Sequence, residues 1–369
     1  MLNNPISSVS WINLLVNSAI QGSLIFIPLL GAQLGASDFQ VGLIGAAYGG
    51  TYLLFSLYSG RQSDRKGRMV FIRAGLFLCA IAFAAQIFAY NLYTLIIVRA
   101  AVGIALGITI SSMVAFASDS GADLGRYSSM GSLGWIVGSL AGAMITAFSQ
   151  LFAVSALCCL VAFCLSLTIP SREKTRPGEK GFPGIARVFS RGSRIYIAIF
   201  LRHLGAASVW IILPLYFTSI GISHSWIGLL YGLNFAVQFL VMRRLEHYNP
   251  VRVFALGQVL SIFVFITYIF ASHLWLAVIA QMMLGVAWSC LYVGALVLVL
   301  QTGESKGTAS GIFQSTLNLC GVIGPFLGGL IANIWGYQWV MVFAAALGVA
   351  GLMVAAKDRK EVMAPEAPG

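Results

Sequence analysis

The stretch of sequence that decides the fold is GRQSDRKGRM, residues 60–69. Arg61, Asp64, Arg65, Lys66 and Arg68 make half of it charged, whereas only 9% of the 369-residue chain is charged and 59% is hydrophobic. The mean hydropathy is +0.89, well above that of a soluble domain, in which about half of the residues are apolar. So dense a cluster of charge in so apolar a chain indicates a short loop between two membrane-spanning segments.

Apolar runs flank this loop and recur along the whole chain. A helix needs about 20 apolar residues to cross a hydrocarbon core about 30 Å thick, and its backbone groups must be paired within the helix. Strands of a membrane barrel are only about 10 residues long, which excludes that class. We therefore predict an all-α integral membrane protein. Its twelve predicted transmembrane helices cover residues 9–33, 40–59, 69–89, 92–117, 129–148, 150–169, 194–218, 223–242, 251–271, 273–299, 309–333 and 336–356.

The basic residues lie on one side of the predicted helices. All but two of the 22 Lys and Arg residues follow even-numbered spans, and none follows an odd-numbered span. This alternation is the positive-inside rule, and it accounts for the net charge of +11 without nucleic acid as a partner. We expect a multi-pass protein of the cell membrane (plasma or inner membrane), with the lipid bilayer around it and both termini in the cytoplasm.

The second half of the chain repeats the first at a shift of 186 residues. The residues that the two copies share are Pro28 and Pro214, Gly35 and Gly221, and Gly42 and Gly228. Six spans return the chain to its starting side, so the two copies run in parallel, as in transporters built from a duplicated unit. We predict two six-helix bundles related by a pseudo-two-fold axis. Residues 1–169 form the first, 170–193 a cytoplasmic linker, and 194–369 the second with a short cytoplasmic tail.

Polar residues inside the spans fall into register under the same repeat. Asn17 corresponds to His203 and Tyr48 to Asn234, and in the fourth helix of each copy Arg99 corresponds to Gln281 at a slightly different shift. Polar groups in spans usually face the bundle interior or a wet cavity, although each of them can also link neighbouring helices by hydrogen bonds. The predicted substrate cavity comprises Asn13, Asn17, Gln21, Tyr48, Tyr52, Arg99, Arg202, His203, Trp210, Asn234, Gln238, Gln281, Trp288, Gln314 and Asn318.

The charged stretch resembles a motif of the major facilitator superfamily of secondary transporters. The family's loop between helices 2 and 3 reads G-x-x-x-D-R-x-G-R, and the matching residues here are Gly60, Asp64, Arg65, Gly67 and Arg68. The helix-4 pattern R-x-x-x-G is matched by Arg99 and Gly103. The helix-5 antiporter-like pattern is matched by Gly134, Gly138 and Gly142, with Ser139 where proline is usual.

This resemblance implies transport by alternating access and a role for the loop motif. In the family, the matching acid meets the cytoplasmic start of helix 11, here near residues 308–310, and locks the two halves when the inside is closed. A carboxylate at a helix N-terminus is stabilised by about 0.3–2 kcal/mol. Asp64 is therefore the expected centre of a cytoplasmic gate, and the alternative is that it pairs with Arg65 or Arg68 in water.

Two substrate classes remain open. The resemblance of the first helices and of the helix-5 pattern to drug antiporters slightly favours efflux of drug-like or lipophilic compounds, although the spans contain no carboxylate to receive a cationic drug. Arg99 and Arg202 are always charged and favour a small organic anion or a polar metabolite. His203 is the span residue that titrates near neutral pH and is the candidate for coupling to an ion such as H+. A membrane sensor that does not transport is a remote alternative.

Other classes of protein are disfavoured by missing motifs. The chain has no G-x-S-x-G nucleophile setting, no nucleotide-binding G-x-x-x-x-G-K-[ST] and no metal-ligand spacing among its six cysteines. We therefore expect no enzyme activity, no cofactor and no metal. The expected partner is a small-molecule substrate, bound by a monomer.

Overall fold

The computed structural model describes residues 5–120, 124–170, 185–245, 248–301 and 306–356. The described residues form thirteen α-helices and one short 3-10 helix, and the predicted all-α class is confirmed. The N-terminal half, as the term is used below, comprises α1 (Pro5–Leu24), α2 (Ile27–Gln33), α3 (Asp38–Lys66), α4 (Arg68–Ala85), η1 (Gln86–Phe88), α5 (Leu92–Asp119), α6 (Leu124–Met144) and α7 (Phe148–Leu167). The C-terminal half comprises α8 (Ile185–Ser219), α9 (His224–Met242), α10 (Pro250–Ile269), α11 (Leu274–Gln301), α12 (Lys306–Trp335) and α13 (Tyr337–Ala356).

The helices agree with the predicted spans in number and order. Eleven segments of the described residues are long and apolar enough to cross a membrane, and α1 and α2 together make the first of them. The remaining predicted span, 129–148, corresponds to α6, which is rich in glycine and serine and packs against α1 and α9. The span predicted at 194–218 belongs to a longer helix, since α8 begins at Ile185.

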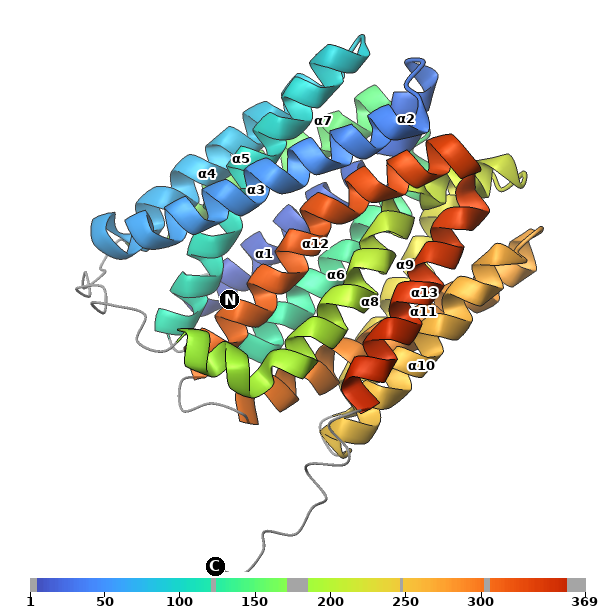
Figure 1. Cartoon of the computed structure of the whole chain (residues 1–369). Helices are drawn as coiled ribbons and strands as arrows, with labels where there is room; N and C mark the ends of the chain where they lie inside the picture. The colour runs from blue at the N-terminus through green and yellow to red at the C-terminus, as the bar shows by residue number, and fades with distance from the viewer. Residues whose placement is uncertain (1–4, 121–123, 171–184, 246–247, 302–305, 357–369) are drawn as a thin grey trace, which may run out of the picture.

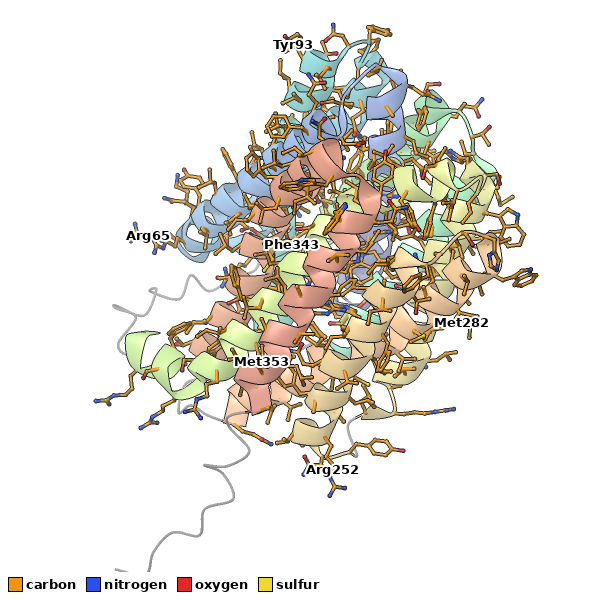
Figure 2. The ribbon with its side chains drawn as sticks, turned by 45° about the vertical axis from the view of Figure 1, so that its right-hand side comes forward. Arg65, Tyr93, Arg252, Met282, Phe343 and Met353 are labelled. Atoms are coloured by element: carbon orange, nitrogen blue, oxygen red, sulfur yellow. The ribbon has the colours of Figure 1, made fainter. Side chains whose placement is uncertain are left out.

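Exposed apolar side chains form a band around the bundle. Met282 of α11 and Met353 of α13 are exposed on the outside of the bundle, whereas Tyr93 lies at one end and Arg65 and Arg252 lie at the other (Figure 2). An outward-facing apolar band is what hydrocarbon requires of a transmembrane bundle. We call the end with Arg65 and Arg252 the basic end and the other the uncharged end, because its loops 34–37, 145–147 and 220–223 carry no Lys or Arg.

The charged stretch 60–69 is helical rather than a loop, which corrects our expectation. Helix α3 continues to Lys66, and only Gly67, with φ 98°, separates it from α4. Arginine, glutamine and lysine are good helix formers, and Arg65 and Lys66 lie in the last turn of α3, where cations are favoured by the helix dipole. Gly60 therefore lies inside α3, and Gly67 makes the turn.

The duplication is visible in equivalent contacts of the two halves. Helix α6 packs on α1 as α12 packs on α8, and α5 packs on α3 as α11 packs on α9. At the second crossing, Gly103 of α5 lies against the carbonyl oxygen of Tyr48, and Gly285 of α11 lies against that of Asn234. These are the residue pairs that the repeat aligned, so the parallel duplication holds in three dimensions.

The two halves meet at the uncharged end. Helix α3 packs on α12, and α6 packs on α9, which is the equivalent pair under the duplication. In Figure 1, α3 and α12 lie close together near α2 and diverge toward the opposite end. A Cβ atom added to Gly42 would come within 2.9 Å of Gly329 Cα, whereas one added to Gly60 or Gly311 would meet nothing within 4 Å. The structure is therefore closed between the halves at the uncharged end.

Two further contacts hold this closed end. The Tyr337 hydroxyl donates a hydrogen bond to Asp38 Oδ1 over 3.0 Å. At the start of α9, the His224 ring stacks on Phe26 with centroids 4.0 Å apart and bonds through Nε2 to the carbonyl oxygen of Gly142 over 3.0 Å. Both contacts join one half to the other.

Candidate substrate site

Three aromatic side chains of the C-terminal half form one cluster. His203 and Trp210 lie two turns apart on α8, and Trp288 comes from α11. The His203 ring stacks on Trp288 with centroids 4.9 Å apart and meets Trp210 edge to face at 5.2 Å, and the two indoles are 5.9 Å apart at 81°. His203 is buried and both indoles are partly exposed. The indoles therefore offer an aromatic surface of the kind on which a flat ligand stacks.

An amide network links α9 to α11, the helix that also carries Trp288. Asn234 Nδ2 donates to the backbone oxygen of Gln281 over 2.9 Å, and Gln238 Nε2 donates to Asn234 Oδ1 over 2.6 Å. The side-chain amide of Gln281 is buried, and within the described residues neither its nitrogen nor its oxygen has a partner. Buried polar groups are normally hydrogen-bonded, so Gln281 is a candidate to bond a ligand.

The polar residues of α1 that were predicted to line the cavity are Asn13, Asn17 and Gln21. Asn13 Nδ2 donates to the carbonyl oxygen of Tyr127 on α6 over 2.9 Å, and Asn17 Nδ2 donates to Asn13 Oδ1 over 2.8 Å. Gln21 is also buried on α1. The bond of Asn13 joins α1 to α6 within the N-terminal half, whereas those of Asn17 stay within α1.

Arg99 lies buried behind an aromatic ring. Its Nη1 donates to Gln86 Oε1 over 3.2 Å, and its guanidinium carbon lies 4.4 Å from the centre of the Tyr48 ring, which stacks in turn on Tyr52. A cation over an aromatic face is stabilised by about 0.5–2 kcal/mol. The fractional exposure of Arg99 is 2%, so its side chain is covered in this conformation.

In the C-terminal half, Arg202 is likewise covered by a polar partner and an aromatic ring. Its Nε donates to Ser261 Oγ on α10 over 2.8 Å, and its guanidinium carbon lies 5.5 Å from the Trp288 ring. The side chain is fully buried. Both arginines are thus covered by neighbouring side chains in this conformation, and their place in the substrate site stays a prediction.

Among the described hydrogen bonds, none links Gln314 or Asn318 to the aromatic cluster. Gln314 is exposed, and its Nε2 approaches Asn318 Oδ1 at 3.5 Å one turn along α12. Their place in the site stays a prediction.

The predicted gate motif is only partly described. The side chain of Asp64 lies outside the described part of the structure, so its expected contact near residues 308–310, in α12, stays a prediction. Arg68, also of the motif, donates through Nε to Asp119 Oδ2 over 3.2 Å and through Nη1 to Ser63 Oγ over 3.0 Å. Asp119, at the end of α5, is thus a partner that the sequence did not indicate.

Several residues around the site escaped the sequence analysis. Gln86 and Ser261 each contact a buried arginine, and Trp135 on α6 reaches across the interface between the halves to Phe235, with ring centroids 5.3 Å apart. The only signal for the first two was that they are polar residues within spans. Among the described residues, no group of three His, Cys, Asp or Glu side chains lies together as a metal site would require.

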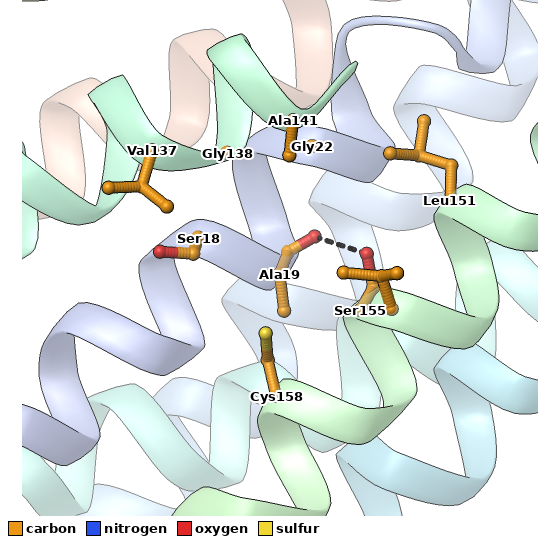
Figure 3. A pocket seen from close by; sticks show the side chains of 10 residues that line it. Ser18, Ala19, Gly22, Val137, Gly138, Ala141, Leu151, Ser155 and Cys158 are labelled. Atoms are coloured by element: carbon orange, nitrogen blue, oxygen red, sulfur yellow. Dashed lines mark hydrogen bonds between the residues drawn. The ribbon is translucent and has the colours of Figure 1, made fainter. Parts of the chain in front are cut away.

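A small cavity lies away from the site, between α1, α6 and α7 (Figure 3). Its volume is about 50 Å³, and Gly22, Gly138, Leu151 and Cys158 are among the residues that line it. Ser155 Oγ, at its edge, donates to the carbonyl oxygen of Ala19 over 3.2 Å. Pockets for organic ligands usually measure about 300–1,000 Å³, so this cavity is a packing defect among small residues rather than a substrate site.

Comparison with known proteins agrees with this architecture. The family model of the Major Facilitator Superfamily matches residues 8–236 and 195–368. The chain is 26% identical over 353 residues to multidrug resistance protein MdtG of Proteus mirabilis, covering 87% of each chain. It is 25% identical over 374 residues to the protein of the same name in Citrobacter koseri, covering 93% of this chain and 91% of that one.

Two solved structures share the fold. The nucleoside transporter NupG superposes with a TM-score of 0.76 at 14% identity, covering 97% of this chain and 99% of that one. The human organic anion transporter MFSD10 superposes with a TM-score of 0.71 at 18% identity, covering 96% and 98%. At such identities the likeness extends to the arrangement of helices alone.

Proposed function

The chain belongs to the Major Facilitator Superfamily, and from this premise we propose that it exports lipophilic aromatic compounds. Membership makes it a multi-pass membrane transporter of a small-molecule substrate, and not an enzyme. The observation that carries the proposal is the cluster of His203, Trp210 and Trp288, whose two indoles are partly exposed. The relatives named multidrug resistance proteins support the same substrate class.

The cluster suits aromatic ligands for a physical reason. Aromatic pairs contribute about 0.5–1.5 kcal/mol beyond the burial of their area, and burial of apolar surface adds about 25 cal/mol per Å². Neither term depends on the detailed shape of the ligand, so an indole surface accepts many flat apolar compounds. The unpartnered amide of Gln281 supplies a donor and an acceptor that can orient a polar substituent.

The orientation of the transporter follows from the charges at its two ends. Under the positive-inside rule the basic end faces the cytoplasm, and both termini lie there with the linker. The structure, closed at the uncharged end, is then the inward-facing state, which loads substrate from the cytoplasm. Export requires α3 to separate from α12, and α6 from α9, while the basic ends approach each other.

The remaining features of the proposal are coupling and environment. We keep H+ as the proposed coupling ion, and His203, which contacts both indoles, is the residue at which to test coupling. The proposed form is a monomer in the lipid bilayer of the cell membrane, with residues 1–169 and 194–369 as the two moving bodies.

The test is transport by purified protein in proteoliposomes, with fluorescent naphthalene derivatives as substrates. Trp288→Ala should abolish uptake into inside-out vesicles. Trp275→Ala is the matched control, because Trp275 belongs to the same helix and is 69% exposed. Equal flux in both variants and the wild type would remove the aromatic cluster from the site, and binding without any flux would favour a sensor over a carrier.

A further inference from the structure

Arg202 is a buried cation that the described residues leave without a counter-charge. Its Nε bonds Ser261 Oγ over 2.8 Å, but neither Nη1 nor Nη2 has a partner within the described structure, and its exposure is 0%. Ser261 donates its own proton to the carbonyl oxygen of Gly257. Arginine stays charged in proteins, and an uncompensated buried charge is strongly destabilising. The guanidinium therefore needs an acceptor from outside the described chain.

The surroundings of Arg202 are neutral. Gln258, one turn before Ser261 on α10, is fully buried; its Nε2 donates to the carbonyl oxygen of Ala198 over 3.3 Å, and its Oε1 has no partner among the described residues. Ala198 lies one turn before Arg202 on α8. The described part of the seam between α8 and α10 thus holds an arginine, a glutamine, a serine and the Phe265 ring, whose centre lies 5.7 Å from the guanidinium carbon, and none of these is a carboxylate that would repel an anion.

Trp288 belongs to the aromatic cluster and also contacts the seam. Its ring centre lies 5.5 Å from the Arg202 guanidinium carbon and 4.9 Å from the His203 ring centre. The indole is only partly buried. Access to the guanidinium from beside the partly exposed indoles therefore requires Trp288 to move.

We propose that the substrates are amphipathic aromatic anions, whose ring stacks on Trp210 and Trp288 while a carboxylate binds Nη1 and Nη2 of Arg202. The two terminal nitrogens form a fork that matches a planar carboxylate by two parallel hydrogen bonds. This inference deepens the proposed function and rests on it. The predicted spans contain no acidic residue that could bind a cationic drug. An anionic aromatic substrate needs no such residue, so it fits both the aromatic site and the composition of the spans.

The test compares three ligands that share one ring system: 2-naphthoate, 2-naphthalenemethanol and 2-naphthylmethylammonium. Dissociation constants are measured by calorimetry on the full-length protein in detergent. The wild type should bind the anion about ten-fold or more tightly than the neutral alcohol, since a hydrogen bond to a charged group contributes more than a neutral one. Arg202→Gln should remove this preference and leave the affinity for the alcohol unchanged.

Two further variants keep the test decisive if Arg202→Gln does not fold. Arg202→Lys keeps the charge but loses the fork, so it should retain only part of the preference. Arg191→Gln removes an exposed cation of the same helix and should change nothing. Because arginine does not titrate, the preference should persist between pH 5 and 8; a preference that appears only at the acidic end would assign the anion to His203 and overturn the proposal.

The remaining outcomes separate this inference from the function on which it rests. Equal binding of anion and alcohol by the wild type would refute the role of Arg202 while leaving an aromatic exporter intact. Failure of the wild type to bind any of the three ligands would refute the proposed function itself. Repeating the binding measurements in high chloride distinguishes a substrate carboxylate from an inorganic anion as the ligand of Arg202. Chloride should weaken naphthoate binding by competition. If chloride stabilised the protein and naphthoate did not, the seam would be a site for inorganic anions, and the proposal would be refuted.

Discussion

The contact between α3 and α12 makes a sharp test of alternating access, through the variant Gly42→Ala. A Cβ atom on Gly42 would lie 2.5 Å from the carbonyl oxygen of Pro325 and 2.9 Å from Gly329 Cα. Ordinary carbon–oxygen contacts of this kind are about 3.3–3.6 Å, and carbon–carbon contacts about 3.5–4.0 Å. One methyl group therefore requires the two helices to move apart by about 1 Å at the closed end.

The cost of this displacement can be bounded. Overpacking by a methyl or methylene group costs about 1–3 kcal/mol in a well-packed interior. Gly42 and its neighbours belong to different halves, so the cost applies only to the state that is closed at the uncharged end. A bias of about 1–3 kcal/mol changes a two-state equilibrium about 5- to 150-fold, and the variant should populate the state open at that end.

The assay is the distance between spin labels at Gln33 and Gln338, two exposed positions at the uncharged ends of the two halves. The six native cysteines are free and are replaced first. Gly42→Ala should increase the population with long distances. Gly50→Ala is the control on the same helix, because its Cβ would meet only Val322 Cγ1 at 3.9 Å, and it should match the wild type.

A contrasting variant separates gating from folding. Gly103→Ala introduces an overlap with Tyr48 inside the N-terminal half, so it should lower the melting temperature instead of changing the label distance. If Gly42→Ala gave the wild-type distance distribution and the wild-type melting temperature, the helices would not be in contact there and the closed end would be wrongly placed.

Three other variants test separate features of the structure. Gly22→Ala should raise the melting temperature by about one to three degrees, because alanine is favoured over glycine in a helix by about 1 kcal/mol. The added Cβ would come no closer than 3.3 Å to its nearest neighbour, the carbonyl oxygen of Gly138. A lower melting temperature would show that the space beside Gly22 is already filled. His224→Phe keeps the ring stacking at the uncharged end but loses a hydrogen bond of about 1 kcal/mol, so the same spin labels should report about five-fold more of the open state, and an unchanged distribution would deny that bond a role in closure. Asp64→Asn should weaken closure at the basic end by up to about 2 kcal/mol, seen as longer distances between labels at the basic ends of α3 and α12. Asp119→Asn, which alters a contact within one half, should leave these distances unchanged, and equal behaviour of the two variants would count against the gate.

Hydropathy and charge were sufficient to predict the architecture, because each span is recognised from its own apolar residues and each loop from its own charges, without knowledge of which helices touch. The twelve spans, their order and the basic end follow from apolar runs about 20 residues long and from the placement of Lys and Arg. The shift of 186 residues that joins Gly35 to Gly221 also predicted the parallel duplication, and both glycines have φ near +80° in the structure. What local rules missed was a boundary: residues 60–66 are polar enough for a loop, yet they continue α3.

The site depended on how each helix is rotated about its axis and on which helices meet, and hydropathy carries no information about either in chains whose helices are apolar all round. The repeat placed Arg99 and Tyr48 in register with Gln281 and Asn234, but only packing decided that both arginines point away from exposed surface. Arg202 meets Ser261 of α10, and His224 lies between the rings of Phe26 and Phe148. Such contacts join helices distant in sequence, and those of His224 also depend on the conformational state, because they join the two halves at one end only while that end is closed.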